Sequence, residues 1–484
     1  MDVGALPTIA EPTRDRPVLY DVDVVVAGAG LSGTFAAIAA AQQGAGTVLV
    51  ERLAALGGNM GPAMICGGNL VEQVDITLPG GFCGIPREFI RRVEALRIGS
   101  LRRYPEESNI ASFVAAEMMQ QAGVEVLLSA RASDPILDGG RVGGLFVECK
   151  GGRVAVQAKT TVDATGDAEL ALRAGAAIVP YTPPDEALHD YIRPDYMKPQ
   201  HPTFYNDTLL LSVISNVDLA KYDEYAAQTA ELSADDEAWG RETGAIPYFP
   251  SPMIPALHTA WDEGAFRPWV EIVPEVWLGS PHRFEDYRDG NVELYVPCLG
   301  AIDATDPVML SRIEMALRTQ AFRFVRFYRE NVPGFENAYL LVSAPFLGMR
   351  GGPHIEGVHT LTPQEAFAGR KCDDVLFRNT HEMDHGGDPS GFDVPYGIAL
   401  PSGVEGLLVC GRGAAYIRRG HDPSGMRHRA CMMLLGQCIG TAAALAAMAD
   451  IPPHELDVRQ LQSRLLAEGI FLGENDRLVE LGLR

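Results

Sequence analysis

The residues with the most specific chemistry lie near the start of the chain. Gly28, Gly30 and Gly33 form the pattern G-x-G-x-x-G, and the acid Glu51 follows. In such a pattern the first glycine permits a tight turn, the second lets the backbone approach a pyrophosphate, and the third lets a helix pack closely on a strand. Amides at the helix N-terminus bind phosphates, and the later acid accepts hydrogen bonds from ribose hydroxyls. These residues therefore predict a dinucleotide site.

The surrounding sequence supplies the elements that this site needs. The apolar run 22–27 is typical of a strand buried on both faces. Residues 34–43 are rich in alanine and predict a slim helix that ends at Gly44, and residues 47–50 predict a second strand before Glu51. A glycine-rich turn alone is weak evidence. Strand, turn, helix, strand and acid in this order predict a complete dinucleotide-binding βαβ unit.

Length, charge and cysteine content limit the function classes. A chain of 484 residues exceeds the size of one hydrophobic core, so we expect two or more lobes. The formal net charge of −23 opposes binding to nucleic acids and to anionic membranes. We expect no bilayer-spanning segment and no signal peptide in the loose leader 1–20. Eight cysteines without a C-x-x-C pair favour a reducing cytoplasm.

The remainder of the first lobe reads as alternating helices and strands. Glycines at 57 and 58 open a loop of small residues that can lie against a ligand through its backbone. Short strands separated by Asp-Gly-Gly and Gly-Gly predict a three-stranded meander. The expected elements are helices 85–96 and 106–121, strand 124–128, meander strands 135–137, 142–147 and 154–157, strand 161–164, and helix 169–174.

The periodic pattern is lost over 181–340, where prolines, aromatic residues and acids increase, as in an inserted lobe. A helix near the end of this region begins with Asp306 as N-cap and Pro307 at its first position. Its stripe of apolar and aromatic residues predicts core packing. After 343 the chain becomes rich in glycine again, with a short strand at 406–410, a Gly-Arg-Gly turn, and an alanine-rich helix at 423–448.

The order of these motifs resembles one known enzyme family. Residues 162–167 read Val-Asp-Ala-Thr-Gly-Asp, and residues 407–412 read Leu-Leu-Val-Cys-Gly-Arg. Together with the βαβ unit, and with the segments 333–338 and 436–443, they resemble the FAD-dependent oxidoreductases related to the flavoprotein subunits of fumarate reductase and succinate dehydrogenase. The resemblance spans residues 20–178 and about 333–449, and it covers little of the inserted lobe.

The resemblance implies the fold and the cofactor. We expect an α/β fold: an FAD-binding, Rossmann-like domain of the glutathione-reductase type with a central parallel sheet and a β-meander, plus an inserted α+β substrate or cap domain. The FAD-binding domain would take residues 21–180 and 343–450, the inserted domain 181–342, and a helical tail 451–484. The expected FAD-binding residues are Gly28, Gly30, Leu31, Ser32, Gly33, Glu51, Arg52, Gly57, Gly58, Asn59, Ala130, Ala164, Thr165, Gly166, Asp167, Gly411, Arg412, Ser424, Gly425 and Met426. The last three begin the late helix, whose N-terminus would stabilise negative charge on the flavin ring.

Candidate substrate residues lie in segments that this fold would bring near the flavin: His421, His354, Arg350, Tyr396 and Arg427. A histidine can accept a hydroxyl proton because its pKa lies near neutrality, and an arginine can orient a carboxylate. His421 is the first choice for the acid–base group and His354 the second. At Arg350 the sequence departs from the family pattern, because Gly-Gly-Pro-His follows it.

Two further features are interpreted as non-functional. The cluster of His381, Glu382, Asp384 and His385 lacks the spacing of a helical metal site, so no metal is expected. Cys66 lies in a glycine-rich loop that could approach the flavin. Relatives that tether flavin use a histidine near this position, and none is present here, so FAD should bind noncovalently.

The favoured function is hydride transfer between flavin N5 and a hydroxyl- or amine-bearing carbon of a small polar substrate. One alternative is reduction of an activated C=C bond, with Arg350, Arg412 or Arg427 as proton donor and carboxylate clamp. Another is a redox-silent flavin-binding or electron-carrying subunit of an assembly. The expected partners are a small-molecule substrate and a second copy of this chain, with neither nucleic acid nor a membrane.

Overall fold

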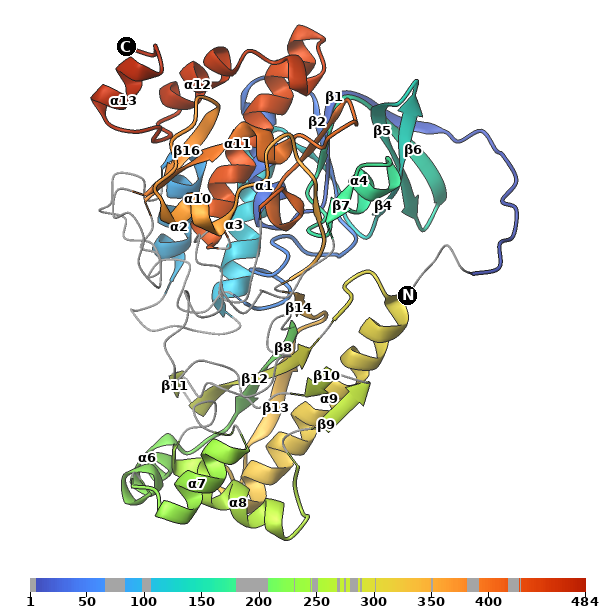
Figure 1. The fold of residues 1–484 in the computed structure, drawn as a ribbon. Coiled ribbons are helices and arrows are strands. Elements are labelled where there is room, and N and C mark those ends of the chain that lie inside the picture. The colour runs from blue at the N-terminus through green and yellow to red at the C-terminus, as the bar shows by residue number, and fades with distance from the viewer. Residues whose placement is uncertain are drawn as a thin grey trace.

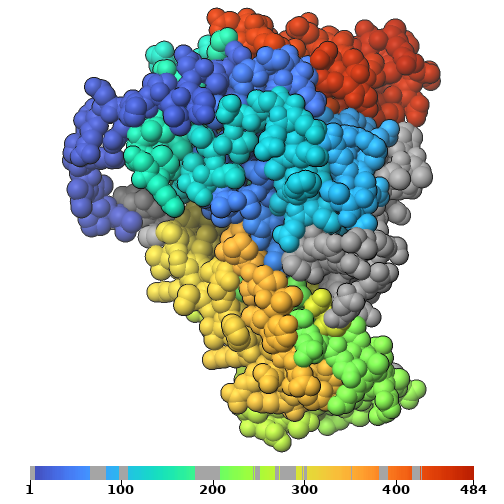
Figure 2. Space-filling model, turned by 180° about the vertical axis from the view of Figure 1, so that it is seen from behind, coloured from blue at the N-terminus to red at the C-terminus, as the bar shows by residue number. Residues whose placement is uncertain are grey.

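The computed structural model describes residues 6–65, 83–97, 106–179, 208–229, 231–243, 245, 251–267, 270–273, 276–278, 286–287, 290–300, 302–349, 351–380, 391–416, 426 and 428–484. Two larger sheets lie one above the other in Figure 1, and helices cover both. The upper part holds both ends of the sequence, and the lower part holds its middle (Figure 2).

The first sheet has seven strands in the order β3-β2-β1-β6-β5-β4, with β18 beside β6. The pairs β3–β2, β2–β1, β1–β6 and β6–β18 are parallel, whereas the pairs β6–β5 and β5–β4 are antiparallel. The strands are β1 (Val18–Ala27), β2 (Thr47–Val50), β3 (Glu125–Leu127), β4 (Arg131–Asp138), β5 (Arg141–Cys149), β6 (Gly152–Asp163) and β18 (Leu407–Val409). The expected parallel strands and the expected meander are both present, and they join in one sheet, which is therefore mixed.

One strand joins the meander to the parallel part of this sheet. The sequence predicted separate strands at 154–157 and 161–164, but β6 is continuous over 12 residues. The predicted break covers residues 158–160, which read Ala-Lys-Thr. Lys159 Nζ donates to Asp23 Oδ1 of β1 at 2.8 Å, so its charge is satisfied at the surface without interrupting the strand.

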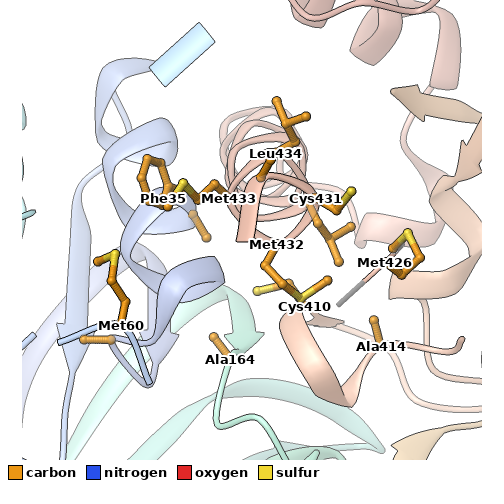
Figure 3. Close-up of a cluster of buried hydrophobic side chains, with 14 of the residues drawn as sticks. Phe35, Met60, Ala164, Cys410, Ala414, Met426, Cys431, Met432, Met433 and Leu434 are labelled. Carbon is orange, nitrogen blue, oxygen red and sulfur yellow. The ribbon is translucent and has the colours of Figure 1, made fainter. Parts of the chain in front are cut away.

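The core of the first part is a tight pair of helices, α1 (Leu31–Gln42) and α11 (Arg429–Ala449). A Cβ added at Gly436 would meet the Ser32 carbonyl oxygen at 2.2 Å, and one at Gly440 would meet that of Ala36 at 2.0 Å. Glycine at these positions lets the two backbones approach closely. Figure 3 shows the buried side chains around this helix pair, with Met432 of α11 in the same cluster as Ala164.

The α11 helix is more apolar than the sequence analysis expected. By length and composition alone it could cross a membrane, a test that buried core helices also meet. In the fold, 89% of its apolar window is buried inside the protein. Its hydrophobicity is therefore accounted for by packing against α1 and the first sheet.

The second sheet comes from the middle of the chain and has the order β13-β8-β12-β10-β9, with β11 beside β12 and β14 beside β8. Helix α9 contacts β8, β9, β12 and β13 (Figure 1). The strands are β8 (Thr208–Ser215), β9 (Val270–Val273), β10 (Val276–Leu278), β11 (Asp286–Tyr287), β12 (Asn291–Gly300), β13 (Tyr339–Ser343) and β14 (Gly348–Met349). The helices are α6 (Leu219–Gln228), α7 (Ala234–Glu242), α8 (Ile254–Asp262) and α9 (Pro307–Asn331).

The long helix α9 forms as the sequence predicts. Asp306 is its N-cap, and this carboxylate accepts hydrogen bonds from Val308 N at 2.9 Å and Met309 N at 3.0 Å. Leu317 and Phe324, on the predicted stripe, are fully buried. The predicted cap and core face of this helix are confirmed.

The remaining described elements complete the upper part. Helices α2 and α3 agree with prediction within two residues at each end. The bounds are α2 (Gly84–Leu96), α3 (Glu106–Ala122), α4 (Glu169–Arg173), β7 (Ile178–Val179), β15 (His354–Ile355), α10 (Pro363–Phe367), β16 (Val375–Asn379), β17 (Phe392–Pro395), α12 (Val458–Ala467) and α13 (Asn475–Glu480).

Candidate active site

The turn from β1 into α1 leaves space for a ligand at Gly30, on the side of the pocket. Gly28 has φ +97°, and a Cβ there would meet the Ala164 carbonyl oxygen at 2.6 Å. A Cβ at Gly33 would meet the Gly28 oxygen at 1.9 Å, so this glycine permits the close packing of the turn. A Cβ at Gly30 would meet nothing within 4 Å. Gly30 thus leaves space on the pocket side, next to the N-terminal amides of α1.

Glu51 fixes this turn from the end of β2. It is 6% exposed, and its carboxylate accepts hydrogen bonds from Ala29 N at 2.7 Å and from Leu53 N at 2.8 Å. The Ala130 amide donates to the Glu51 carbonyl at 3.0 Å. Glu51 and Arg52 line the pocket, so a carboxylate is held where a ribose is expected.

The glycine loop after Glu51 packs directly on the turn. Gly57 N donates to the Ala29 carbonyl at 2.8 Å. A Cβ at Gly58 would meet Gly30 Cα at 2.9 Å. Asn59 Nδ2 donates to the Met349 carbonyl at 3.1 Å, which ties this loop to β14 of the second sheet. Gly58 and Asn59 line the pocket as the sequence analysis expected of ligand-facing residues.

The Thr165-Gly166-Asp167 turn is organised by a buried acid. The Asp163 carboxylate accepts from Thr165 N at 3.0 Å, Thr165 Oγ1 at 2.7 Å, Leu170 N at 2.9 Å and Ala171 N at 3.0 Å. Burial raises the pKa of this carboxyl, and the hydrogen bonds oppose that rise. Asp163 therefore shapes the turn and anchors α4, while Thr165 to Asp167 line the pocket.

Arg412 connects three segments that are distant in sequence. Its Nε donates to the Gly166 carbonyl at 3.1 Å, its Nη1 donates to the Met349 carbonyl, and its Nη2 forms an ion pair with Asp167 at 2.7 Å. Arg412 lines the pocket, but its guanidinium is committed to protein groups. The structure thus gives it a positioning role at the cofactor site.

A single pocket of about 470 Å³ contains most of these residues. Its walls come from both sheets. From the first part come Gly28, Gly30, Leu31, Ser32, Glu51, Arg52, Gly58, Asn59, Arg131, Ala164, Thr165, Gly166, Asp167, Gly411, Arg412, Tyr416, His428, Arg429 and Met432, among others. From the second sheet and its border come Leu209, Leu211, Glu293, Tyr295, Phe346, Leu347, Gly348 and Met349.

These residues fit FAD by their geometry. The open space at Gly30 and the N-terminal amides of α1 suit a pyrophosphate. The fixed carboxylate of Glu51 suits an adenosine ribose. Beyond them the pocket continues past Gly411 to Tyr416 and the start of α11. Because β2 and β18 lie on opposite sides of β1, the flavin end is expected on this second side.

Not every expected cofactor residue lines the pocket. Gly33 packs inside the turn, Gly57 supports the loop, and Ala130 is buried next to the pocket residues Arg131 and Ala132. Met426 is fully buried outside the pocket lining. Ser424 and Gly425 lie outside the described residues.

The expected catalytic residues are placed differently. His354 lies on β15, is 5% exposed, and its Nδ1 is 2.9 Å from the Ile355 carbonyl oxygen. Tyr396 is buried and donates its hydroxyl to the Pro453 carbonyl at 2.9 Å, and burial raises its pKa. Neither lines the pocket. Arg350, His421 and Arg427 lie outside the described residues, as do Cys66 and the cluster from His381 to His385.

The start of α11 corrects the predicted helix boundary. The sequence predicted a helix from 423, but α11 begins at Arg429 with His428 as N-cap residue. Both residues line the pocket. Arg429 Nη2 donates to the Ile65 carbonyl at 2.6 Å, while its buried Nη1 has no hydrogen-bond partner among the described residues.

Sequence reasoning missed several pocket residues. One feature could have pointed to His428 and Arg429. An arginine at the first position of a helix is unfavourable beside the helix dipole, which suggests a role in binding. Glu293 and Tyr295 lie in the irregular region that sequence patterns did not resolve, and they had no comparable signal. Among the described residues, no group of three or more His, Cys, Asp or Glu could hold a metal ion.

Comparison with known proteins places this geometry among flavoproteins. The family model described as FAD dependent oxidoreductase matches residues 23–465, which is most of the chain. The chain is 33% identical over 170 residues to digeranylgeranylglycerophospholipid reductase 1 of Methanopyrus kandleri, covering 34% of this chain and 44% of that protein. It is 30% identical over 180 residues to the thiamine thiazole synthase of Pyrobaculum aerophilum, covering 34% and 63%. The match thus spans less than two thirds of either relative.

Solved structures also resemble this chain at low identity. A geranylgeranyl bacteriochlorophyll reductase-like protein from Thermoplasma acidophilum aligns over 96% of both chains, with 12% identity and a TM-score of 0.38. A flavoprotein/dehydrogenase from Cytophaga hutchinsonii aligns over 96% of this chain and 92% of its own, with 14% identity and a TM-score of 0.42.

Proposed function

This chain belongs to the FAD-dependent oxidoreductase family, and from that premise we propose that it oxidises or reduces a small organic molecule held between its two sheets. One observation carries the proposal: a single pocket is lined both by the dinucleotide-binding residues Gly30 and Glu51 and by Leu211 and Glu293 of the second sheet. A cofactor and a substrate would therefore meet in one pocket. In this proposal residues 181–342, with β14, act as the substrate-binding cap.

FAD is the cofactor of the family, and we propose that it binds noncovalently. Gly28, Gly30, Glu51 and the 165–167 turn would hold its adenosine and pyrophosphate. When bound, FAD supplies the hydride-accepting or hydride-donating centre of the reaction. The chain's own residues orient the substrate, exclude water and manage the substrate's proton.

We favour dehydrogenation of a carbon that bears a hydroxyl or an amine. His428 supports this direction, because it is buried in the pocket wall and an imidazole can hold a proton near neutral pH. His421, the first candidate in the sequence, stays a proposal. Replacing each histidine by asparagine tests the two candidates. Replacement of the one that serves as the base should remove most of kcat.

A second candidate function is reduction of a C=C bond, as in fumarate-reductase flavoproteins. Arg429 supports it, since this arginine lines the pocket at the first position of α11. The relation to fumarate reductase itself is part of this proposal. A dehydrogenase should lose activity in His428→Asn, whereas a reductase that relies on Arg429 should lose it in Arg429→Gln.

The first experiment is the visible spectrum of the purified protein. A yellow protein whose absorbance is bleached without oxygen by amines or alcohols supports the dehydrogenase, and bleaching by NADH or NADPH favours the reductase. Failure to bleach with amines, alcohols and enoates would favour a redox-silent flavin-binding or electron-carrying subunit. A colourless protein would contradict the FAD assignment.

Location and assembly complete the proposal. We propose a cytoplasmic protein that self-associates and has no nucleic-acid or membrane partner, on the basis of its cysteine pattern and its charge of −23. Light scattering after size-exclusion chromatography tests self-association, and cell fractionation tests the location.

A further inference from the structure

Helix α9 has a second apolar face, which points away from its sheet. Val308, Met315 and Phe322 are 49%, 68% and 65% exposed, whereas Leu317 and Phe324 are fully buried. The three exposed residues recur every seven positions, close to two helical turns, so they form one line about 21 Å long, the outer stripe. Exposed apolar side chains that line up in this way are typical of a surface that another molecule covers.

Arginines flank the outer stripe. Helix α9 carries five arginines and two glutamates. Two of the arginines pair with these glutamates, Arg318 with Glu314 and Arg326 with Glu330. The other three are exposed and form no ion pair with any residue that the structure describes: Arg312, Arg323 and Arg329. The outer face of α9 is therefore a basic surface on a chain whose formal net charge is −23.

Three helices of the same lobe carry the opposite charge. Helices α6, α7 and α8, the acidic helices, contain seven acids, one lysine and one arginine. The lysine, Lys221, pairs with Glu336, and the arginine, Arg241, pairs with Glu237. Four exposed acids make no ion pair within the described part of the chain: Asp223, Glu224, Asp235 and Glu242.

The acidic helices adjoin the second half of α9. Phe266, shortly after α8, stacks on Phe327 of α9 with ring centroids 4.7 Å apart. Tyr222 of α6 packs edge-on against Phe335, which follows the end of α9, at 5.6 Å between centroids. Figure 1 shows the acidic helices at the foot of α9. This lobe thus carries a basic and an acidic surface next to each other.

Neighbouring surfaces of opposite charge suit a two-fold dimer. An axis at their border places the basic surface of one copy on the acidic surface of the other, and symmetry repeats the contact in reverse. Two α9 helices placed face to face would instead bring their arginines together, which is unfavourable. A stable interface buries about 800 Å² on each partner, so the charged residues around the outer stripe must take part.

We propose that this protein forms a two-fold dimer, in which the outer stripe and the arginines of α9 bind the acidic helices of a second copy. This gives the proposed self-association its interface. The residues of α9 and of the acidic helices lie outside the pocket lining, so the inference does not depend on the oxidoreductase function.

The oligomeric state of the FAD-loaded protein tests the proposal. Sedimentation equilibrium over a range of protein concentrations gives the Kd of the dimer. Raising NaCl from about 0.05 M to about 0.5 M should weaken the dimer at least tenfold, because salt screens the attraction between exposed charges. A protein that stays monomeric throughout, or a dimer whose Kd does not change with salt, overturns the proposal.

Charge reversal locates the interface. Arg312→Glu combined with Arg323→Glu should weaken the dimer at least tenfold. Adding Glu224→Arg and Glu242→Arg to this variant should recover affinity at least threefold, because both contacting surfaces have then changed sign. Failure of the added substitutions to recover affinity would show that the acidic helices are not the partner surface.

A matched control separates the interface from net charge. Lys150→Glu combined with Lys371→Glu changes the net charge of the chain by the same amount, at exposed residues outside both surfaces. This variant should keep the Kd within twofold. Unchanged FAD content and thermal midpoint show that each variant is folded.

The outer stripe has a test of its own. Met315→Ser combined with Phe322→Ser should weaken the dimer at least tenfold at both salt concentrations, because the lost apolar contact is not screened by salt. Phe113→Ser removes a side chain that is 56% exposed on α3, outside the proposed interface, and should leave the Kd unchanged.

The outcomes separate this inference from the proposed function. A monomer overturns the inference and the proposed self-association, and it leaves the oxidoreductase function intact. A dimer that the α9 substitutions do not weaken overturns the inference alone. Equal weakening in the lysine control or in Phe113→Ser would also overturn it, because the effect would then come from net charge or from the loss of any exposed apolar side chain.

Discussion

At the scale of single residues, the glycines of the first turn serve different purposes. Gly28 is required by the backbone, since its φ is +97° and a Cβ would meet the Ala164 carbonyl oxygen at 2.6 Å. Gly30 has φ −67° and open space where a Cβ would be. The fold itself would accept alanine at Gly30, so its absent side chain serves the ligand.

These two glycines give a matched pair of substitutions. Gly30→Ala should reduce FAD affinity at least tenfold and leave the stability of the FAD-free protein unchanged, because its methyl group enters only the pocket. Gly28→Ala should destabilise the FAD-free protein by about 1–3 kcal/mol through backbone strain and overlap. Flavin fluorescence titration and urea unfolding measure the two effects. Equal loss of FAD-free stability in both variants would contradict this division.

At the scale of elements, short polar contacts fix where helices begin and how they pair. The carboxylate of Asp306 caps α9, the helix that covers the second sheet. In α2, Glu88 accepts hydrogen bonds from Arg91 and Arg92, and Arg92 also pairs with Glu117 of α3. These contacts are local, and their effects on stability are correspondingly small.

The α9 cap can be tested by removing its acceptor. Asp306→Ala should lower the free energy of unfolding by about 1 kcal/mol, because two helix amides lose their partner. Asp306→Asn keeps an acceptor and should cost less. Urea denaturation of both variants measures the difference. Equal losses would show that charge, and not capping, is the source of the effect.

The pH dependence of α2 follows from the Glu88 cluster. Hydrogen bonds from Arg91 and then Arg92 lower the pKa of Glu88 to about 2. A lowered pKa means that the stabilisation is present above the unfolded pKa of about 4.5 and is lost as pH falls toward 2. Because the pair is exposed to solvent, the contribution should stay below about 1 kcal/mol. Glu88→Gln should therefore lose less stability than the parent protein between pH 5 and pH 3; equal slopes would contradict the assignment.

At the scale of the whole molecule, the two sheets meet at β14. Its Met349 carbonyl accepts hydrogen bonds from Asn59 and from Arg412, and Arg412 also pairs with Asp167. These contacts join the glycine loop, the 165–167 turn and the second sheet around one pocket. The alignment of the two sides of the pocket thus depends on a few polar contacts between distant segments.

Breaking this connection should affect the pocket more than the core. Arg412→Met should speed amide hydrogen exchange over 346–349 and weaken FAD binding several-fold, because the Gly166 carbonyl loses the Arg412 donor and the Met349 carbonyl keeps only Asn59. Exchange in α1 and α11 should stay unchanged, since these helices pack mainly on each other. Exchange measured by mass spectrometry tests this. Faster exchange throughout the upper part would instead indicate general unfolding.

The sequence alone determined the βαβ unit, the meander and the cap of α9, and through them the broad family of FAD-dependent oxidoreductases, but not the closer relation to fumarate reductase. These features depend on contacts between near neighbours: glycines at a turn, an acid at a strand end, and an acceptor before a helix. The same local signals placed Gly28, Gly30 and Glu51, which line the pocket or shape its turn. They failed at residues 158–160, where pairing with β1 continues and β6 is unbroken.

Only the tertiary structure decided which residues face the cofactor from the other side. Glu293 and Arg429 are far apart in sequence and have no local pattern in common, yet one pocket contains both. Conversely, His354 and Tyr396 looked chemically suitable, but neither lines the pocket, and His354 Nδ1 and the Tyr396 hydroxyl each contact a backbone carbonyl oxygen. Local sequence sets the conformation of a segment, whereas the sites of chemistry arise where distant segments pack, and that depends on the whole chain.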